Sequence, residues 1–320
     1  MKKHLLCLIL TLTFIINCFP GNMSKESPTD STSSSYYNFY SDLAYDPIST
    51  EFNMDKILEI SEGGDDVMGS GKAFEPFSKG DSSRWTSGGI DHTHQFLCAR
   101  GIVLLVEDKS LEYGDLIYPY GHVILMGADA PDIDENQCLY VHHFYHAILK
   151  KNYAMVGDTA KDKFLLHSQL ALELYARDKH EAFDHLGRAI HYLSDMNEPH
   201  HASNLTFANS NHGQYEKWVD ERRKDFILSN GTMYDDYKSM NFNTALITLA
   251  ERSAANGYKM KDYAQGKKIE THGAYPLLLN DYDLWYLSAR STMLYAQDAI
   301  STFLYIFFKE LKANAFIRMA

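Results

Sequence analysis

The stretch GRAIHYLSDMNEPHHASN, residues 187–204, decides how the rest of the sequence is interpreted. His191 and Asp195 stand four residues apart in a run with the apolar spacing of a helix, so both side chains leave the same helix face about one turn apart. Pro199 ends that helix, and His201 follows on the irregular segment beyond it. Three side chains that bind metals well lie close together, and the stretch therefore predicts a metal site.

A second pair with the same spacing supports this interpretation. His212 and Glu216 stand at the head of another amphipathic run, so two helices would face each other with imidazole and carboxylate donors. Taken alone, a histidine and a carboxylate four residues apart more often form a surface hydrogen bond than a metal site. Together, and without a nearby cysteine, the donors favour zinc in a hydrolytic site, and the several carboxylates favour more than one ion.

The first part of the chain predicts export. Residues 1–18 hold two lysines followed by an apolar run, which is the form of a secretory signal and is too short for a membrane span. Cys18 closes this run and would suit a lipid attachment site, although Asn17 before it does not favour one. Secretion and lipid anchoring at the cell surface therefore both stay open. We interpret residues 19–84, which begin with a polar stretch of low complexity, as a tether and a pro-segment or linker.

Residues 85–320 have the size of one domain with a buried core. Helical periodicity is common there and strand signals are scarce, so we expect an all-α fold, a single compact multi-helix domain with a zinc cluster in a cleft. The expected helices are His92–Glu107, Asp115–Met126, Asp158–Arg177, Glu181–Met196, Gln214–Leu228, Thr244–Lys259 and Asp281–Leu311, with a weaker one at Met54–Ile60 before the domain.

Composition excludes some classes of function. The net charge of −12 and the pI near 5.6 argue against a broad basic face, so no nucleic acid partner is expected. No P-loop or G-x-G-x-x-G motif precedes a strand, so nucleotide binding has no support. The domain contains Cys98 and Cys138, and two cysteines do not decide whether a disulfide forms. No protein partner is inferred.

Three further residues become informative beside these donors. His94 lies in the run IDHTHQFL, His143 in YVHHFY, and Asp129 in GADAPD. Each has an ordinary explanation, because a histidine among aromatic residues is usually a partly buried group with a satisfied hydrogen bond, and an aspartate near a proline is usually a turn or cap residue. These three residues become informative because of their order along the chain.

In that order the residues resemble a known family, the bacterial zinc-dependent phospholipases C, which share an all-helical fold with the S1/P1 nucleases. The resemblance covers most of residues 85–312, and its donors occur in the order that the family has. The matching segments are Trp85 and His94, Gly127–Asp129, His143–Tyr145, residues 187–204, His212–Glu216 and Asp281–Trp285.

The resemblance implies a cluster of three zinc ions. The implied ligand sets are His143, His191 and Asp195; His201, His212 and Glu216; and His94, a bridging Asp195, and the terminal amine and carbonyl of Trp85. Asp129 would match the residue proposed as general base. Such a cluster would offset the charge of a phosphodiester, activate a water molecule and stabilise the leaving oxygen.

A terminal amine at Trp85 requires processing. An amide nitrogen inside a chain has no lone pair to give a zinc ion at neutral pH, whereas a terminal amine does once its proton is displaced. Cleavage after Arg84, a basic residue that a trypsin-like protease could reach in a flexible run, would create that amine. The sequence thus predicts a precursor that binds fewer ions, and the ordinary alternative is that Trp85 is a core aromatic residue.

The implied activity is that of a phospholipase C, which releases diacylglycerol and a phosphorylated headgroup at a phospholipid membrane surface. Tyr140 keeps one aromatic residue of the headgroup site of the phosphatidylcholine-cleaving members, whereas Gly88 and Ala130 stand where we look for two other lining residues, so the headgroup stays open. One alternative is an S1/P1-like single-strand nuclease, for which we expect an aspartate where Glu216 stands. The other is a non-catalytic zinc-stabilised surface lipoprotein, which has no need of Asp129.

Overall fold

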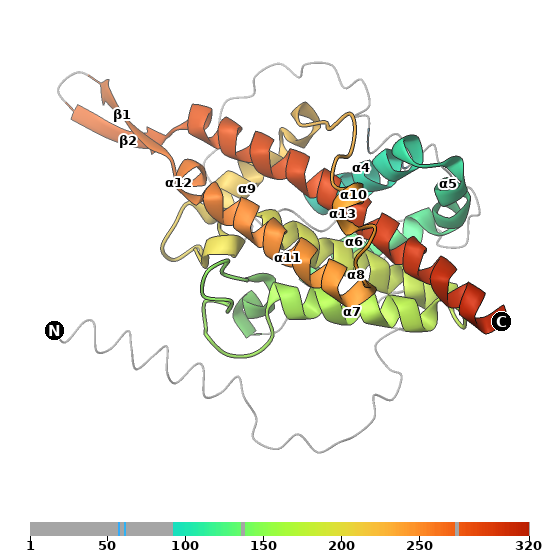
Figure 1. Ribbon diagram of the computed structural model, residues 1–320. Helices are drawn as coiled ribbons and strands as arrows, with labels where there is room; N and C mark the ends of the chain where they lie inside the picture. Colours follow the sequence, from blue (N-terminus) through green and yellow to red (C-terminus); the bar gives the residue numbers. More distant parts are fainter. Residues whose placement is uncertain (1–56, 58–60, 62–91, 136–137, 273–274, 320) are drawn as a thin grey trace, which may run out of the picture. The chain divides into compact units, whose positions relative to one another are not determined.

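The structure is a computed structural model that describes residues 57, 61, 92–135, 138–272 and 275–319 (Figure 1). Contacts within the chain divide it into two units, Met1–Ile48 and Ser49–Ala320, and every described residue belongs to the second. The predicted signal sequence, the tether and the cleavage site at Arg84 and Trp85 lie outside the described residues. Of the weaker helix expected before the domain, only Ile57 is described, and it is helical and buried.

The described residues are almost entirely helical, which confirms the all-α expectation. The α-helices are α4 (Thr93–Asp108), α5 (Leu111–Ile117), α6 (Gly121–Asp134), α7 (Ala160–Leu174), α8 (Lys179–Asn197), α9 (His212–Asp220), α10 (Tyr234–Tyr237), α11 (Phe242–Lys259), α12 (Lys261–Ala264) and α13 (Tyr282–Met319). Short 3-10 helices are η1 (Tyr118–Tyr120), η2 (Cys138–His143), η3 (His201–Ser203) and η4 (Arg223–Asp225). One antiparallel two-stranded ribbon, β1 (Lys267–His272) with β2 (Tyr275–Asn280), stands between α12 and α13.

Helix α8 lies at the centre of the bundle and carries the stretch on which the sequence analysis began. It packs against α6, α7, α11 and α13, and every residue from Leu186 to Asn197 is buried (Figure 1). The helix begins where the carboxylate of Asp178 accepts a hydrogen bond from the backbone N–H of Glu181, and it ends just before Pro199. A polar face of α8 is therefore held inside the protein.

Two glycines let α6 approach α8 very closely. A Cβ atom at Gly187 would lie 2.3 Å from the carbonyl oxygen of Ile124, and one at Gly127 would lie 2.4 Å from that of Asp184. These neighbours are backbone atoms, so the two helices would have to separate to admit any larger residue. The crossing places the second half of α6 directly beside the polar face of α8.

We expect Gly187→Ala to lower the free energy of unfolding by at least about 2 kcal/mol, because overpacking against backbone costs roughly 1–3 kcal/mol or more. The displacement of α6 from α8 should also lower the affinity for metal. Chemical denaturation of purified variant and wild type measures the first effect. A variant as stable as wild type would show that the two helices can separate without cost.

Ion pairs fix the C-terminal end of α6 to the same helix. The guanidinium group of Arg188 donates to Asp184, Asp134 and Glu135 at 2.7 Å each. Tyr192 donates to the same Glu135 at 3.0 Å. Removal of these carboxylates would leave the buried charge of Arg188 unpaired, so the contacts hold the two helices in one register.

Helix α13 closes the core from the other side. It packs on α4 and α11, and its large side chains Trp285, Phe303 and Phe307 are fully buried. Cys98 on α4 lies in this core as a free thiol. Within the part of the chain that the structure describes, no helix combines the length and hydropathy that a bilayer span needs.

Three expectations about local structure were wrong. The segment Asp115–Met126 is divided between α5 and α6, because Pro119 lies in the short η1 turn between them. The helix expected to run to Leu228 ends at Asp220, whose carboxylate instead accepts from the backbone N–H and hydroxyl of Thr93 at 2.9 and 2.7 Å. The β1–β2 ribbon was not predicted.

Candidate metal centre

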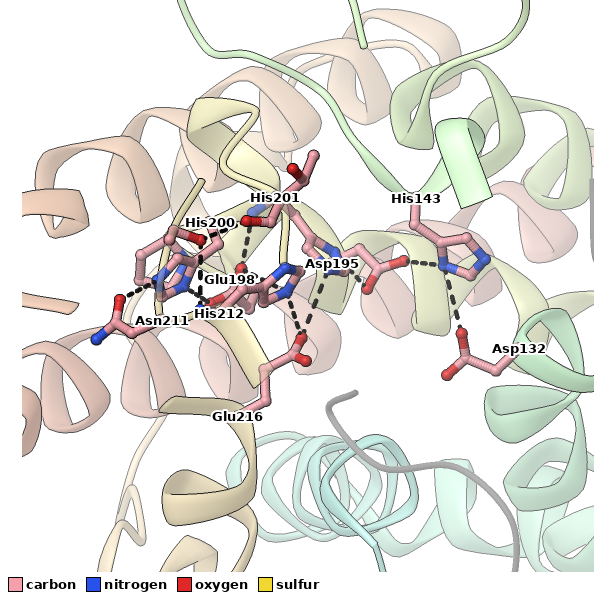
Figure 2. Close-up of polar contacts among 12 residues, drawn as sticks. Asp132, His143, Asp195, Glu198, His200, His201, Asn211, His212 and Glu216 are labelled. Carbon is pink, nitrogen blue, oxygen red and sulfur yellow. Dashed lines mark hydrogen bonds and ion pairs between the residues drawn. The ribbon is translucent and has the colours of Figure 1, made fainter. Parts of the chain in front are cut away.

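Five separate elements bring histidines and carboxylates to one buried region (Figure 2). Helix α8 supplies two of the donors, and α4, η2, η3 and α9 supply the others. The donors expected from the sequence that meet here are His94, His143, His191, Asp195, His201, His212 and Glu216, and all of them are buried. Trp85 lies outside the described residues.

Asp195 contacts both histidines of the first group. Its Oδ2 lies 2.8 Å from Nδ1 of His143 and 3.3 Å from Nε2 of His191, and these two nitrogens are 3.1 Å apart. One donor atom from each residue falls within 4.8 Å of the others. A zinc ion holds its nitrogen and oxygen ligands at about 2.0–2.2 Å, so three ligand atoms at these separations can surround one ion.

A second group combines His94, Asp132 and His191 within the same distance limit. The rings of His94 and His191 stack with their centroids 3.9 Å apart. Nδ1 of His191 donates to the carbonyl oxygen of Ala128 at 2.8 Å, so only Nε2 can bind a metal. Because this one nitrogen belongs to both groups, His143, His191, Asp195 and Asp132 can surround a single ion, with His94 stacked beside it.

The third group lies on the other side of Asp195 and consists of Glu198, His201, His212 and Glu216. Oε1 of Glu216 is 2.8 Å from Nε2 of His212 and 3.5 Å from Nε2 of His201. Nδ1 of His201 is also 2.9 Å from Oδ1 of Asp195, so the two oxygens of one carboxylate face the two halves of the site (Figure 2). The described donors thus gather in two adjoining clusters that could each hold an ion, and Asp195 of the first contacts His201 of the second.

Two members of these groups were missed in the sequence. Asp132 lies on α6, with its Oδ1 3.7 Å from Nδ1 of His143 and 3.9 Å from Nε2 of His191. It stands one helical turn after Asp129 with Pro131 between them, and we had ended the helix before that proline, whereas α6 continues through it. The three-residue spacing within one helix was the signal that could have found it.

Glu198 is the other missed residue. It follows the last residue of α8, is fully buried, and has its Oε2 3.9 Å from Nε2 of His212. The same oxygen accepts from the backbone N–H of His201 at 2.7 Å, and Oε1 pairs with Nδ1 of His200 at 2.8 Å. Nε2 of His200 continues the chain of contacts to the side chain of Asn211 at 3.3 Å. A carboxylate before a proline is usually a turn residue, so its spacing carried no signal.

The groups around the first ion site have pKa values shifted in opposite directions. Burial, together with His191, lowers the pKa of His94 to about 3. Burial also opposes the charged form of His191, but Asp195 and Asp132 outweigh it and raise its pKa to about 9. Although burial disfavours the charge of Asp195, the facing histidines hold its pKa well below the usual value. This carboxylate is therefore ionised at neutral pH inside the protein.

The second ion site has the same character. The pKa of His201 is raised to about 10, because Asp195, Glu198 and Glu216 outweigh its burial. Burial and the neighbouring histidines hold the pKa of His212 well below its usual value. Burial disfavours the charge of Glu198, but His200 lowers its pKa to about 2. Buried carboxylates with this much negative charge need cations close by.

The residues fit bound metal ions in a further respect. The atoms that face one another are imidazole nitrogens and carboxylate oxygens: Nδ1 of His143 and Nε2 of His191 lie beside Asp195, and Nε2 of His212 lies beside Glu216. Imidazole and carboxylate donors without thiolates are the set that zinc takes in hydrolytic sites.

The other two residues expected at the site lie close to it. Asp129 is fully buried on α6 but belongs to none of the three groups that the described residues form. Tyr140 lies on η2 with its ring 5.7 Å from that of His143. Its φ of 55° is in the left-handed region, which costs a tyrosine on the order of 1 kcal/mol and is maintained mostly where function requires it.

Comparisons with known proteins show the family of this chain. A family model described as zinc-dependent phospholipase C matches residues 93–259, more than half of the chain. The chain is 27% identical over 239 residues to a phospholipase C of Paraclostridium bifermentans, covering 68% of this chain and 58% of that protein. It is 33% identical over 106 residues to a phospholipase C of Bacillus cereus, covering 32% of this chain and 38% of that protein.

Solved structures show the same fold. The alpha toxin of Clostridium absonum superposes with a TM-score of 0.59 at 24% identity, covering 68% of this chain and 63% of the toxin. Clostridium perfringens alpha-toxin gives 0.58 at 22% identity, again covering 68% and 63%. The fold and the buried donors define a helical metalloprotein. The chain belongs to the zinc-dependent phospholipase C family, and it spans less than two thirds of the length of the P. bifermentans relative.

Proposed function

We propose that this protein is a zinc-dependent phospholipase C that hydrolyses the phosphodiester of glycerophospholipids to diacylglycerol and a phosphorylated headgroup. The observation that carries the proposal is the pair of adjoining donor clusters, linked by the contact between Asp195 and His201, in a chain of this family. Bound zinc ions would offset the phosphate charge and activate the attacking water. The residues of the chain hold the ions, orient the substrate and accept a proton.

Three ions are proposed, as the resemblance implies, and the described residues account for two of them. The first ion is held by His143, His191, Asp195 and Asp132, and the second by His201, His212, Glu216 and Glu198. The third depends on His94, the shared Asp195, and the amine that cleavage before Trp85 would create. Nε2 of His94 lies 3.9 Å from Oδ1 of Asp195, within reach of one ion between them.

We propose that Asp132 is the carboxylate of α6 that binds the first ion. Its Oδ1 is within 4 Å of nitrogens on His143 and His191, close enough to share an ion with them. Asp129 on the same helix belongs to none of the three donor groups, so we propose it as the base that takes a proton from the attacking water.

Asp132→Asn should lose bound zinc, because it removes a ligand of the first ion. Asp129→Asn should keep the zinc content of wild type but lower turnover by on the order of 100-fold or more, the usual scale for losing a general base. Elemental analysis and headgroup release measure the two effects. An Asp129→Asn enzyme with full zinc and full turnover would exclude Asp129 as the base.

The sequence also supports proposals on export, domain organisation and the substrate surface. We propose that residues 1–18 direct export, that 19–84 form a tether and pro-segment, and that 85–320 form the catalytic domain, secreted or lipid-anchored at Cys18. The partner is a phospholipid membrane surface. Tyr140, held beside His143, is the residue that we propose contacts the headgroup.

One set of assays tests the function. Purified protein beginning at Trp85 is offered phosphatidylcholine, phosphatidylethanolamine, phosphatidylinositol and single-stranded DNA, each with and without a chelator. We expect cleavage of at least one phospholipid, loss of that activity with the chelator, and no cleavage of DNA. Cleavage of DNA alone would establish the nuclease alternative, and a zinc-loaded protein that cleaves none of the four would be the non-catalytic lipoprotein.

A further inference from the structure

The β1–β2 ribbon carries large apolar side chains that the rest of the domain does not cover. The side chains of Ile269, Leu278 and Tyr275 are 71%, 67% and 77% exposed, and Leu277 and Leu279 are also exposed. The ribbon extends away from the helices at the junction of α12 and α13 (Figure 1). Single exposed apolar residues are ordinary, but a contiguous set of them marks a surface that binds something.

The two faces of the ribbon differ from those of a sheet that packs on protein. Ile269 is directly opposite Leu278 on one face, whereas the alternation of a strand puts Leu277 and Leu279 on the other. A ribbon that docks on a protein surface needs one apolar face and one polar face. Leucines on both faces suit a partner that can surround them, and fluid hydrocarbon does so.

The charges of the ribbon lie mainly at its base. Lys267 and Lys268 begin β1, opposite Asn280 and Leu279 at the end of β2. Glu270 forms an ion pair with Lys268 at 3.1 Å on the same face as Leu279, so the face with Ile269 is the more apolar of the two. Lysines at the base and apolar residues beyond them match the order of phosphates and acyl chains across a membrane interface.

The ribbon also lies next to the proposed active site. The side-chain amide of Asn280 donates to Gln214 of α9 at 3.2 Å. A surface hollow of about 690 Å³ is lined by Lys267 at the base of β1 and by Phe207, Asn211 and Gly213, which flank the ligand His212. The exposed ring of Phe207 stacks on His212 with their centroids 4.6 Å apart. A surface that holds the ribbon would therefore lie beside the second ion site.

We propose that the β1–β2 ribbon docks this domain on a phospholipid bilayer and so presents the lipid headgroups to the metal centre. Only the purpose of docking, the delivery of headgroups to the metal centre, rests on the proposed function. Attachment to the bilayer itself needs no hydrolysis. The described part of the chain adds no third strand to this ribbon, so its strand edges remain at headgroup depth and only its side chains reach the acyl chains.

The test compares two double variants as holoenzymes of the full chain. Ile269→Ser with Leu278→Ser removes the more apolar face of the ribbon. Leu111→Ser with Ile247→Ser removes exposed apolar side chains from α5 and α11 and is the matched control. We expect the ribbon variant to sediment with phosphatidylcholine vesicles at least about tenfold more weakly than wild type. The control should sediment as wild type does, and the melting temperatures of all three proteins should agree.

The second measurement separates docking from chemistry. Hydrolysis of monomeric dihexanoyl-phosphatidylcholine should be unchanged in the ribbon variant, while hydrolysis of vesicles should fall with its sedimentation. Equal vesicle binding by the ribbon variant and wild type would overturn the proposal. The proposal would also be overturned if the wild-type protein did not bind vesicles and instead self-associated through the ribbon. If wild type hydrolyses neither phosphatidylcholine substrate, the assay with the other phospholipids decides the proposed function, and vesicle sedimentation still decides the docking.

Discussion

Asp195→Asn is expected to abolish activity and to remove zinc from both halves of the site. Oδ2 of Asp195 faces His143 and His191, and Oδ1 faces His201, so one carboxylate contacts donors of both ion sites. Asparagine keeps the shape but presents a neutral amide, whose nitrogen cannot bind a metal that the carboxylate oxygen had bound. The loss should exceed the roughly 10- to 100-fold that follows when a residue that only orients a ligand is changed.

The measurement is the zinc content per polypeptide, with headgroup release from phospholipid measured on the same samples. Asp298→Asn is the matched control. Asp298 is also a buried carboxylate, but it accepts hydrogen bonds from Thr232 and belongs to none of the metal-binding groups. The control should keep its zinc even if its stability falls. A full zinc content in the Asp195→Asn protein would contradict the role of Asp195 as a zinc ligand.

Removal of zinc by a chelator should lower the melting temperature by more than about 10 °C. Binding of an ion at 1,000 times its Kd stabilises a protein by about 4 kcal/mol, and 1 kcal/mol is worth roughly 2–4 °C in a domain of this size. Without the ions, the carboxylates of Asp195, Glu198 and Glu216 stay buried beside histidines that no longer bind metal. Thermal unfolding with and without chelator checks this, and restored zinc should restore the curve. An unchanged melting curve after complete removal of metal would refute a structural role.

The part of the site that depends on local spacing was predictable from the sequence. His191 and Asp195 lie four residues apart on α8, and His212 and Glu216 lie four apart on α9, so each pair is set by the geometry of one helix. The end of α8 before Pro199 follows from the chemistry of proline. The helical fold as a whole followed from the apolar periodicity of segments such as the C-terminal helix.

The parts that depend on contacts between elements were not predictable. Asp132 joins the site because Gly127 and Gly187 let α6 and α8 touch, and a sequence does not show which glycines make such a contact. Glu198 joins it because the chain turns back after α8 to place His201 near α9. The ribbon was missed because its apolar residues face no core, so they lack the alternation that a half-buried strand shows.

We expect this chain to build a zinc cluster that the amine of Trp85 completes. The test is the zinc content before and after cleavage at Arg84, together with N-terminal sequencing. His191 offers one nitrogen and the described donors gather in two clusters, so we expect about two zinc ions in the uncut chain and about three after cleavage, with a large gain in activity. Equal zinc content and equal activity in the uncut and cut forms would contradict it.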